Sequence, residues 1–150
     1  MSDVYEFLVI GYGNTLRRDD GVGVKVAEAV AALNLPGVNV ITRHQLVPEL
    51  AGVLSQARAV IFVDAAADAD ADLEPREVQA GEDSQILAHA ADPRSLLALS
   101  TQIFGRCPPA WCLAIPVQDF GFGDGLSAHA EAGLQAAVQQ IRQLAGRLLH

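Results

Sequence analysis

The chain has 150 residues, of which 51% are hydrophobic and 19% are charged. This balance is typical of a folded globular protein, and we expect residues 1–150 to form a single domain. The net charge of −8 comes from 18 acidic and 10 basic residues, and the basic residues do not cluster beyond Arg17 and Arg18. Nucleic acids and anionic membrane surfaces need a cationic face, so neither is expected as a partner.

Membrane insertion and export are not expected either. No run reaches the roughly 18 apolar residues of a membrane span, and the first residues lack the basic start of a signal peptide. The two cysteines, Cys107 and Cys112, are too few for a disulfide framework or a complete zinc site, so we interpret them as reduced thiols. These features predict a cytoplasmic location.

The first half of the chain alternates short apolar runs with helical periods. The expected elements are a strand over residues 7–10, a helix over 22–33, a strand over 38–42, a short helix over 48–56 and a strand over 59–64. The first helix is predicted to end at Pro36 and Gly37, which break the helical period. The last of these strands is the clearest, because its apolar run ends abruptly in Asp64.

The second half begins with a low-complexity acidic segment, residues 65–75, which we expect to be a solvent-facing loop. The expected elements after it are an edge strand over 76–80, a helix over 93–104, a strand over 111–115 and a last helix that starts after residue 127. Asp92 and Ser127 are the expected N-caps of the two helices. An apolar stripe is predicted on the last helix, from Leu134, Val138, Ile141, Leu144 and Leu148.

Strands that alternate with helices in this way predict an α/β sandwich with a largely parallel sheet. In such sheets, functional groups gather beyond the carboxyl ends of the strands. Asp19, Asp20 and Asp64 all follow strand ends, so we expect them to lie near one another.

The segment GYGNTLRRDDGVG, residues 11–23, resembles a nucleotide-binding glycine loop only at its start. Gly11 and Gly13 suit a strand-to-helix turn, but the position of the third glycine is occupied by Leu16. Asp19 and Asp20 stand at the helix entrance, where they would repel a pyrophosphate. A nucleotide site is therefore the weaker interpretation.

Each of these carboxylates also has a structural interpretation. Asp19 is expected to cap the following helix, and Asp64 could end its strand as a turn-former. Of the four histidines, His44 follows a strand and His89 lies between Leu87 and the helix start at Asp92 and Pro93, so both are at loop positions. Two carboxylates and an imidazole would make an oxygen and nitrogen ligand set for a borderline divalent ion such as nickel or zinc. The sequence has no zinc-protease or serine-hydrolase motif.

The sequence resembles the maturation endopeptidases of nickel–iron hydrogenases. The resemblance is carried by VIGYGNTLRRDDGVG, by VIFVDA, by His89 ahead of PRSLLALSTQIFG, and by LAIPVQDFGFGDGLS. These segments occur in the family's order and span most of the chain. The resemblance implies a three-layer α/β/α sandwich around a twisted, mostly parallel five-stranded sheet.

The resemblance also implies a reaction. Members of that family remove a C-terminal extension from the hydrogenase large-subunit precursor after nickel has been inserted. It assigns metal contacts to Asp20, Asp64 and His89, and we expect Asp20 and Asp64 to be the catalytic pair. Nickel would be supplied by the precursor, which is the expected partner, and no tightly bound cofactor of the chain's own is expected. The simplest oligomeric state is a monomer.

Residues 43–51, RHQLVPELA, depart from the glycine-rich segment that many members carry after the second strand. This segment and IPVQDFGFGDGLS are similar to the corresponding segments in the subgroup that serves soluble, NAD-linked hydrogenases. The departure makes His44 a candidate for an extra substrate contact. The alternative to a protease is a non-catalytic docking protein that senses nickel in the precursor without cutting it.

Overall fold

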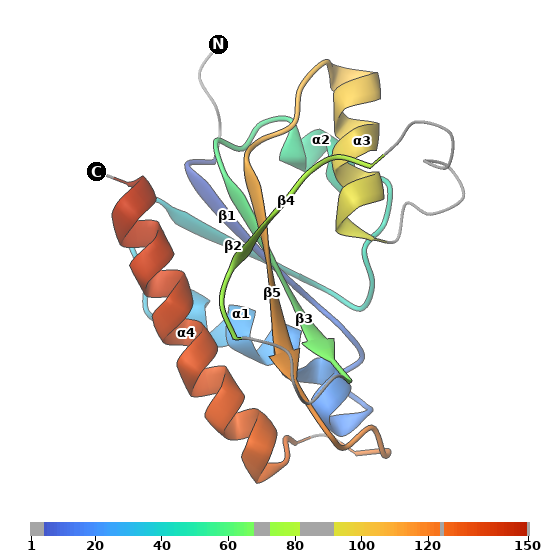
Figure 1. The fold of residues 1–150 in the computed structure, drawn as a ribbon, viewed down its shortest axis with the longest axis vertical. Helices are drawn as coiled ribbons and strands as arrows, with labels where there is room; N and C mark the ends of the chain where they lie inside the picture. The colour runs from blue at the N-terminus through green and yellow to red at the C-terminus, as the bar shows by residue number, and fades with distance from the viewer. Residues whose placement is uncertain (1–4, 68–72, 82–91, 124, 150) are drawn as a thin grey trace.

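The computed structural model describes residues 5–67, 73–81, 92–123 and 125–149, which form one five-stranded sheet flanked by helices. The strands follow the order β2-β1-β3-β5-β4 across the sheet. They are β1 (Phe7–Tyr12), β2 (Val38–Arg43), β3 (Val60–Ala66), β4 (Arg76–Val78) and β5 (Ala110–Pro116). Neighbouring strands pair in parallel, except that the edge strand β4 runs antiparallel to β5 (Figure 1). The predicted five-stranded, mostly parallel sheet is confirmed.

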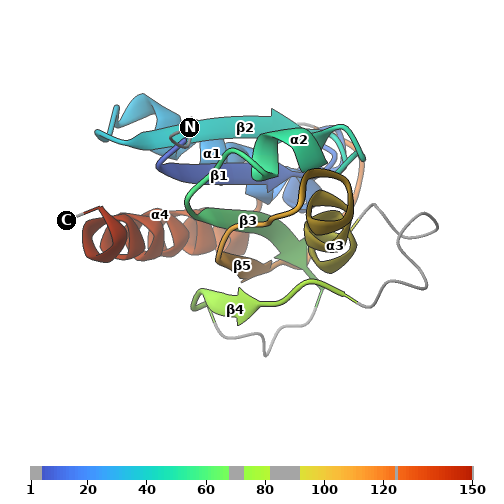
Figure 2. The same cartoon turned by 90° about the horizontal axis from the view of Figure 1, so that it is seen from above.

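Helices cover both faces of the sheet, which gives the predicted three layers. The helices are α1 (Val22–Ala32), α2 (Leu50–Leu54), α3 (Pro93–Phe104) and α4 (Ala128–Leu148), and a short 3-10 helix, η1 (Arg18–Gly21), precedes α1. Helices α1 and α4 pack on one face, and α2 and α3 pack on the other (Figure 2). Within the described part of the chain, no helix combines the length and the apolar character needed to cross a bilayer.

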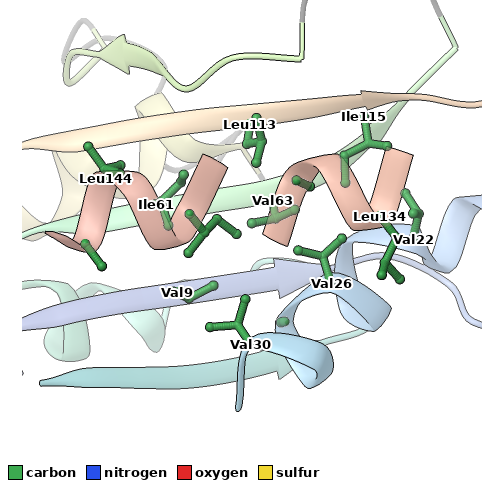
Figure 3. Close-up of a cluster of buried hydrophobic side chains, with 14 of the residues drawn as sticks. Val9, Val22, Val26, Val30, Ile61, Val63, Leu113, Ile115, Leu134 and Leu144 are labelled. Carbon is green, nitrogen blue, oxygen red and sulfur yellow. The ribbon is translucent and has the colours of Figure 1, made fainter. Parts of the chain in front are cut away.

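Alternation along each strand divides the core between these two faces. In β1, Phe7 and Val9 belong to the cluster under α1 and α4, whereas Leu8 and Ile10 belong to the cluster under α2 and α3. Figure 3 shows how side chains from α1, α4 and three strands meet in the first cluster. Because every one of these strands is buried on both sides, its sequence is a continuous apolar run rather than an alternating one.

Several strand and helix boundaries differ from the expected ones, and pairing between strands decides those of the strands. β1 and β2 extend to Tyr12 and Arg43, because their parallel ladder continues in register to that pair. The short helix expected over residues 48–56 is limited to Leu50–Leu54. The edge strand expected over 76–80 ends at Val78, where its pairing with β5 ends.

The expected caps of the two later helices are confirmed. Asp92 accepts a hydrogen bond from the backbone N–H of Ser95 at 2.9 Å, and Ser127 accepts one from that of Ala130 at 3.1 Å. One expectation for α4 is wrong, since Leu148 is 38% exposed and does not continue the buried stripe. The buried stripe consists of the expected Leu134, Ile141 and Leu144 together with small residues such as Ala137.

Candidate functional site

The start of α1 lies against the carboxyl ends of β1 and β3 (Figure 1), and two glycines make this approach sterically allowed. A Cβ added at Gly23 would lie 2.4 Å from the carbonyl oxygen of Val63, and one added at Gly11 would lie 2.2 Å from the carbonyl oxygen of Gly23. The close helix–strand packing that a nucleotide-binding loop obtains from its third glycine is therefore provided here by Gly23. The sequence alone did not indicate this role for Gly23.

The turn between β1 and η1 holds the carboxylate of Asp20. The backbone N–H of Asn14 donates to Asp20 Oδ2 at 3.0 Å, and the side chain of Asn14 accepts from the N–H of Leu16 at 2.9 Å. Gly13 has a φ of 144°, in the region that favours glycine. Asp20 is half-buried, and the bond from Asn14 to Oδ2 sets the orientation of its carboxylate while other lone pairs of the carboxylate stay available.

Asp64 lies in the last part of β3, on the sheet face that carries α2 and α3. Its Oδ1 accepts a hydrogen bond from the N–H of Ala65 at 2.7 Å. Burial raises the pKa of Asp64 to about 6 against the lowering effect of the Ala65 N–H and of the Tyr12 hydroxyl, and the charge of Asp20 raises the pKa further. The charge effect places Asp20 and Asp64 near each other, at the carboxyl ends of the inner strands β1 and β3.

Asp19 does not cap α1, which corrects the sequence-based expectation. Helix α1 begins after Gly21 with no side-chain cap. Asp19 is fully buried, and its carboxylate accepts four hydrogen bonds: from the N–H groups of Gln118, Asp119 and Ser127 at 3.2, 3.0 and 2.8 Å, and from the Ser127 hydroxyl at 2.7 Å. Burial alone would raise the pKa of Asp19, but these hydrogen bonds outweigh it and lower the pKa.

The segment that Asp19 binds, described over residues 117–123 and 125–127, forms a rim beside the Asp20 turn. Arg17 and Gly123 form a short parallel bridge, and the Arg17 guanidinium lies 4.9 Å from the centre of the Phe122 ring. Arg18 pairs with the carboxylate of Asp119 at 3.0 Å. The sequence resemblance marked this segment, but its attachment to the Asp20 turn was not foreseen.

The third predicted metal ligand, His89, lies outside the described residues. Among the residues that the structure does describe, no group of three or more histidine, cysteine, aspartate or glutamate side chains is arranged to hold a metal ion. His44 is exposed and borders a shallow pocket of about 200 Å³ that includes Thr42 and Val24 of α1. This pocket lies on the α1 side of the sheet, whereas Asp64 lies on the α2 and α3 side.

A thiol near Asp64 was also missed as a member of the site. Cys112 in β5 pairs with Phe62, two residues before Asp64 in β3. Burial raises the pKa of the Cys112 thiol to about 11, and the charges of Asp64 and Asp92 add to this effect. Cys112 is a free cysteine, so it is a half-buried thiol that stays protonated near neutral pH beside the carboxylate.

Solved structures of hydrogenase maturation peptidases share this fold. The hydrogenase maturating endopeptidase HybD from E. coli matches with a TM-score of 0.70 at 20% identity, over 95% of this chain and 93% of that one. The [NiFe] hydrogenase maturation protease HybD from Thermococcus kodakarensis matches with a TM-score of 0.69 at 24% identity, over 93% and 99%. HycI from the same organism matches with a TM-score of 0.67 at 21% identity, over 97% and 93%.

No known family profile and no curated protein sequence matches the chain. At these sequence identities the likeness establishes the fold, and the function has to be argued from the site.

Proposed function

We propose that the chain is an endopeptidase that removes the C-terminal extension of a nickel-loaded nickel–iron hydrogenase large-subunit precursor. The proposal joins two independent supports. The fold is that of solved hydrogenase maturation peptidases over nearly the whole chain. The sequence segments that resemble that family supply Asp20 and Asp64, which lie near each other at the carboxyl ends of the inner strands, where α/β proteins place their functional groups.

The observation that carries the proposal is the carboxylate pair itself. Two half-buried carboxylates near enough for the charge of Asp20 to raise the pKa of Asp64 destabilise each other unless a cation or a proton lies between them. A divalent ion carried by the substrate would relieve this repulsion. Carboxylate oxygens are suitable ligands for a borderline ion such as nickel, especially when an imidazole joins them. His89 remains the predicted third ligand.

The nickel in this proposal belongs to the precursor and is bound only as part of the substrate. The two carboxylates would bind a loaded precursor and discriminate against an empty one, because the empty one offers them no cation. Bound nickel supplies Lewis-acid chemistry at the scissile carbonyl or at a water. A carboxylate of the pair accepts the proton of the attacking water, so the chain needs no nucleophile of its own.

Several finer features belong to the same proposal. The processed enzyme would be a soluble, NAD-linked hydrogenase, as the similarity of residues 43–51 to that subgroup suggests. The chain would act as a monomer in the cytoplasm, where the precursor is assembled, and it would hold no tightly bound cofactor of its own.

The test mixes the purified chain with large-subunit precursor, with and without nickel, and measures the mass of the product. We expect a C-terminal peptide to be lost only from the nickel-loaded precursor. A double variant, Asp20→Asn with Asp64→Asn, should lower the cleavage rate by about 100-fold or more. Glu131→Gln, which removes an exposed carboxylate in the first turn of α4, is the matched control and should cleave normally.

Each other outcome of this experiment has a defined meaning. Normal cleavage by the double variant contradicts the role of the carboxylate pair. Cleavage of both forms of the precursor keeps the protease and removes the nickel test. Binding of the loaded precursor without any cleavage supports the non-catalytic docking protein instead.

A further inference from the structure

Two large apolar side chains are exposed beside the Asp20 turn. Leu16 is 67% exposed and Phe122 is 83% exposed, the two highest values among the large hydrophobic residues that the structure describes. Neither side chain belongs to one of the core clusters. Single exposed apolar side chains are common on protein surfaces, but a group of them beside a candidate site indicates an interaction surface.

Backbone hydrogen bonds bring these two residues together although they are distant in the sequence. The N–H of Gly123 donates to the carbonyl of Leu16 at 2.9 Å, and the carbonyl of Gly123 accepts from the N–H of Arg18 at 3.0 Å. These two bonds make the parallel bridge between Arg17 and Gly123. Leu16 and Phe122 therefore precede the bridge on two segments whose backbones run side by side, and we call Leu16, Arg17 and Phe122 together the Leu16–Phe122 surface.

Arg17 holds the Phe122 ring in its exposed position. Its guanidinium lies 4.9 Å from the centre of the ring, within the roughly 6 Å range of a cation–π interaction. None of the carboxylates in the described residues forms an ion pair with Arg17. A ring that is held before binding loses little conformational freedom when a partner packs on it. Aromatic and arginine side chains are also the ones that contribute most to protein–protein affinity.

The surface is continuous with the turn that presents Asp20. The N–H of Asp20 donates to the carbonyl of Arg17 at 3.0 Å, and the N–H of Arg17 donates to the carbonyl of Asn14 at 3.1 Å. The N–H of Asn14 in turn binds the Asp20 carboxylate. A protein that brought a metal to Asp20 would therefore also reach the Leu16–Phe122 surface.

We propose that the Leu16–Phe122 surface is a docking surface for the hydrogenase large-subunit precursor, on which apolar side chains next to its nickel-holding segment pack. This inference rests on the proposed function, because the precursor has to bring its metal to Asp20. The surface supplies affinity that does not depend on nickel, whereas the carboxylates supply the part that does. An anionic membrane does not suit the surface as a partner, because the chain has a net charge of −8.

The experiment measures the dissociation constants of the chain for the nickel-loaded and the nickel-free precursor, the first by rapid mixing before product forms. In the double variant Leu16→Ala with Phe122→Ala, both constants should rise by about tenfold or more, because two anchors are lost. The ratio of the two constants and the cleavage rate at saturating precursor should stay as in the wild type. The melting temperature should also stay the same, since both side chains are exposed.

The matched control is Ile103→Ala with Phe104→Ala, which also removes one aliphatic and one aromatic side chain. Ile103 and Phe104 are 62% and 52% exposed and end α3, which packs on the opposite face of the sheet from α1 (Figure 2). This control should leave both dissociation constants unchanged. A rise as large as that in the double variant would mean that any exposed apolar side chain contributes, and it would overturn the inference.

The other outcomes also decide the matter. Unchanged dissociation constants in the double variant contradict the docking role. A changed ratio would mean that the substitutions act through the Asp20 turn, which overturns the inference as well. Self-association of the wild type that the double variant abolishes, measured by sedimentation, would make the surface an interface between copies of the chain instead.

Failure of this inference can be distinguished from failure of the proposed function. A wild-type chain that neither binds nor cleaves the precursor contradicts both. A wild-type chain that cleaves the loaded precursor, with the same dissociation constants in the double variant, contradicts only the docking surface. A wild-type chain that binds without cleaving, and binds more weakly in the double variant, keeps the docking surface and contradicts the protease.

Discussion

Asp19 and Ser127 bind each other across 108 residues of sequence. The backbone N–H of Ser127 donates to Asp19 Oδ1 at 2.8 Å, and its hydroxyl donates to Asp19 Oδ2 at 2.7 Å. The same hydroxyl oxygen accepts from the N–H of Ala130 and so caps α4. One serine therefore starts the last helix and also secures the turn that precedes α1.

Replacement of Asp19 should destabilise the fold. In Asp19→Asn the amide group would face donors that now face a carboxylate oxygen, and buried donors without acceptors cost about 1–3 kcal/mol each. We expect the free energy of unfolding near neutral pH to fall by about 3 kcal/mol, measured by urea denaturation. Ser127→Ala should cost less, about 1–2 kcal/mol, because the N–H of residue 127 still donates.

The pH dependence of this effect has a definite sign. The pKa of Asp19 is lowered in the folded state from its ordinary value of 3.8, so its stabilising contribution is present above that pH and is lost as the pH falls through the folded-state pKa. The difference in stability between wild type and Asp19→Asn should therefore shrink in acid. A difference that stays constant into acid would contradict the charged state assigned to this carboxylate.

Asp64 should show the opposite dependence. Its pKa rises from 3.8 to about 6 in the folded protein, so its contribution is fully present below pH 3.8 and is lost as the pH rises through about 6. Asp64→Asn should therefore raise the free energy of unfolding at about pH 7 by about 2 kcal/mol and change it little in acid. Thermal melts at a series of pH values measure this, and a variant that is less stable at neutral pH would contradict the raised pKa.

A methyl group at Gly23 should be far more costly than one at Gly146. In Gly23→Ala the new Cβ would meet the carbonyl oxygens of Val63 and Tyr12 at 2.4 and 2.8 Å, so backbone has to move. We expect a loss of stability of about 3 kcal/mol or more. Gly146→Ala in α4 meets nothing within 4 Å and should stabilise by about 0.5–1 kcal/mol, as a helix interior normally prefers alanine. If urea denaturation gave the same change in stability for both variants, the close approach of α1 to the strands would be refuted.

Cys112 can report on the charge of Asp64. The raised pKa of its thiol, due first to burial and then to the charges of Asp64 and Asp92, keeps the reactive thiolate scarce near neutral pH. In a Cys107→Ser background, Asp64→Asn should speed alkylation of Cys112 several-fold, by about the effect of one nearby charge. Mass spectrometry follows the reaction, with Glu131→Gln as the remote-charge control, and an unchanged rate would show that the two side chains do not interact.

The sequence predicted the layers of the fold well, because local patterns determine them. Short apolar runs mark the buried strands, and Asp92 and Ser127 are recognisable caps, since a helix N-terminus needs a side-chain acceptor next to it in the chain. The three-layer arrangement and the pairing of Asp20 with Asp64 followed from the order of elements and from the family resemblance.

The features that were missed depend on distant residues. Asp19 resembled a helix cap because the four donors that bind it lie about 100 residues further on. The role of Gly23 follows from the close approach of α1 to the ends of the strands, which no local pattern indicates. Leu148 fits the helical period but is exposed at the end of α4, where Leu149 packs against the core instead.

The hydrogen bonds that Asp19 accepts from Gln118, Asp119 and Ser127 also affect the order in which the protein folds during its synthesis. A ribosome produces the Asp20 turn about 100 residues before the donors that bury Asp19. Contacts of such long sequence separation form late in folding. While it is being made, the chain therefore carries a hydrated Asp19 and an unset Asp20 turn, and both take their final form only as α4 docks.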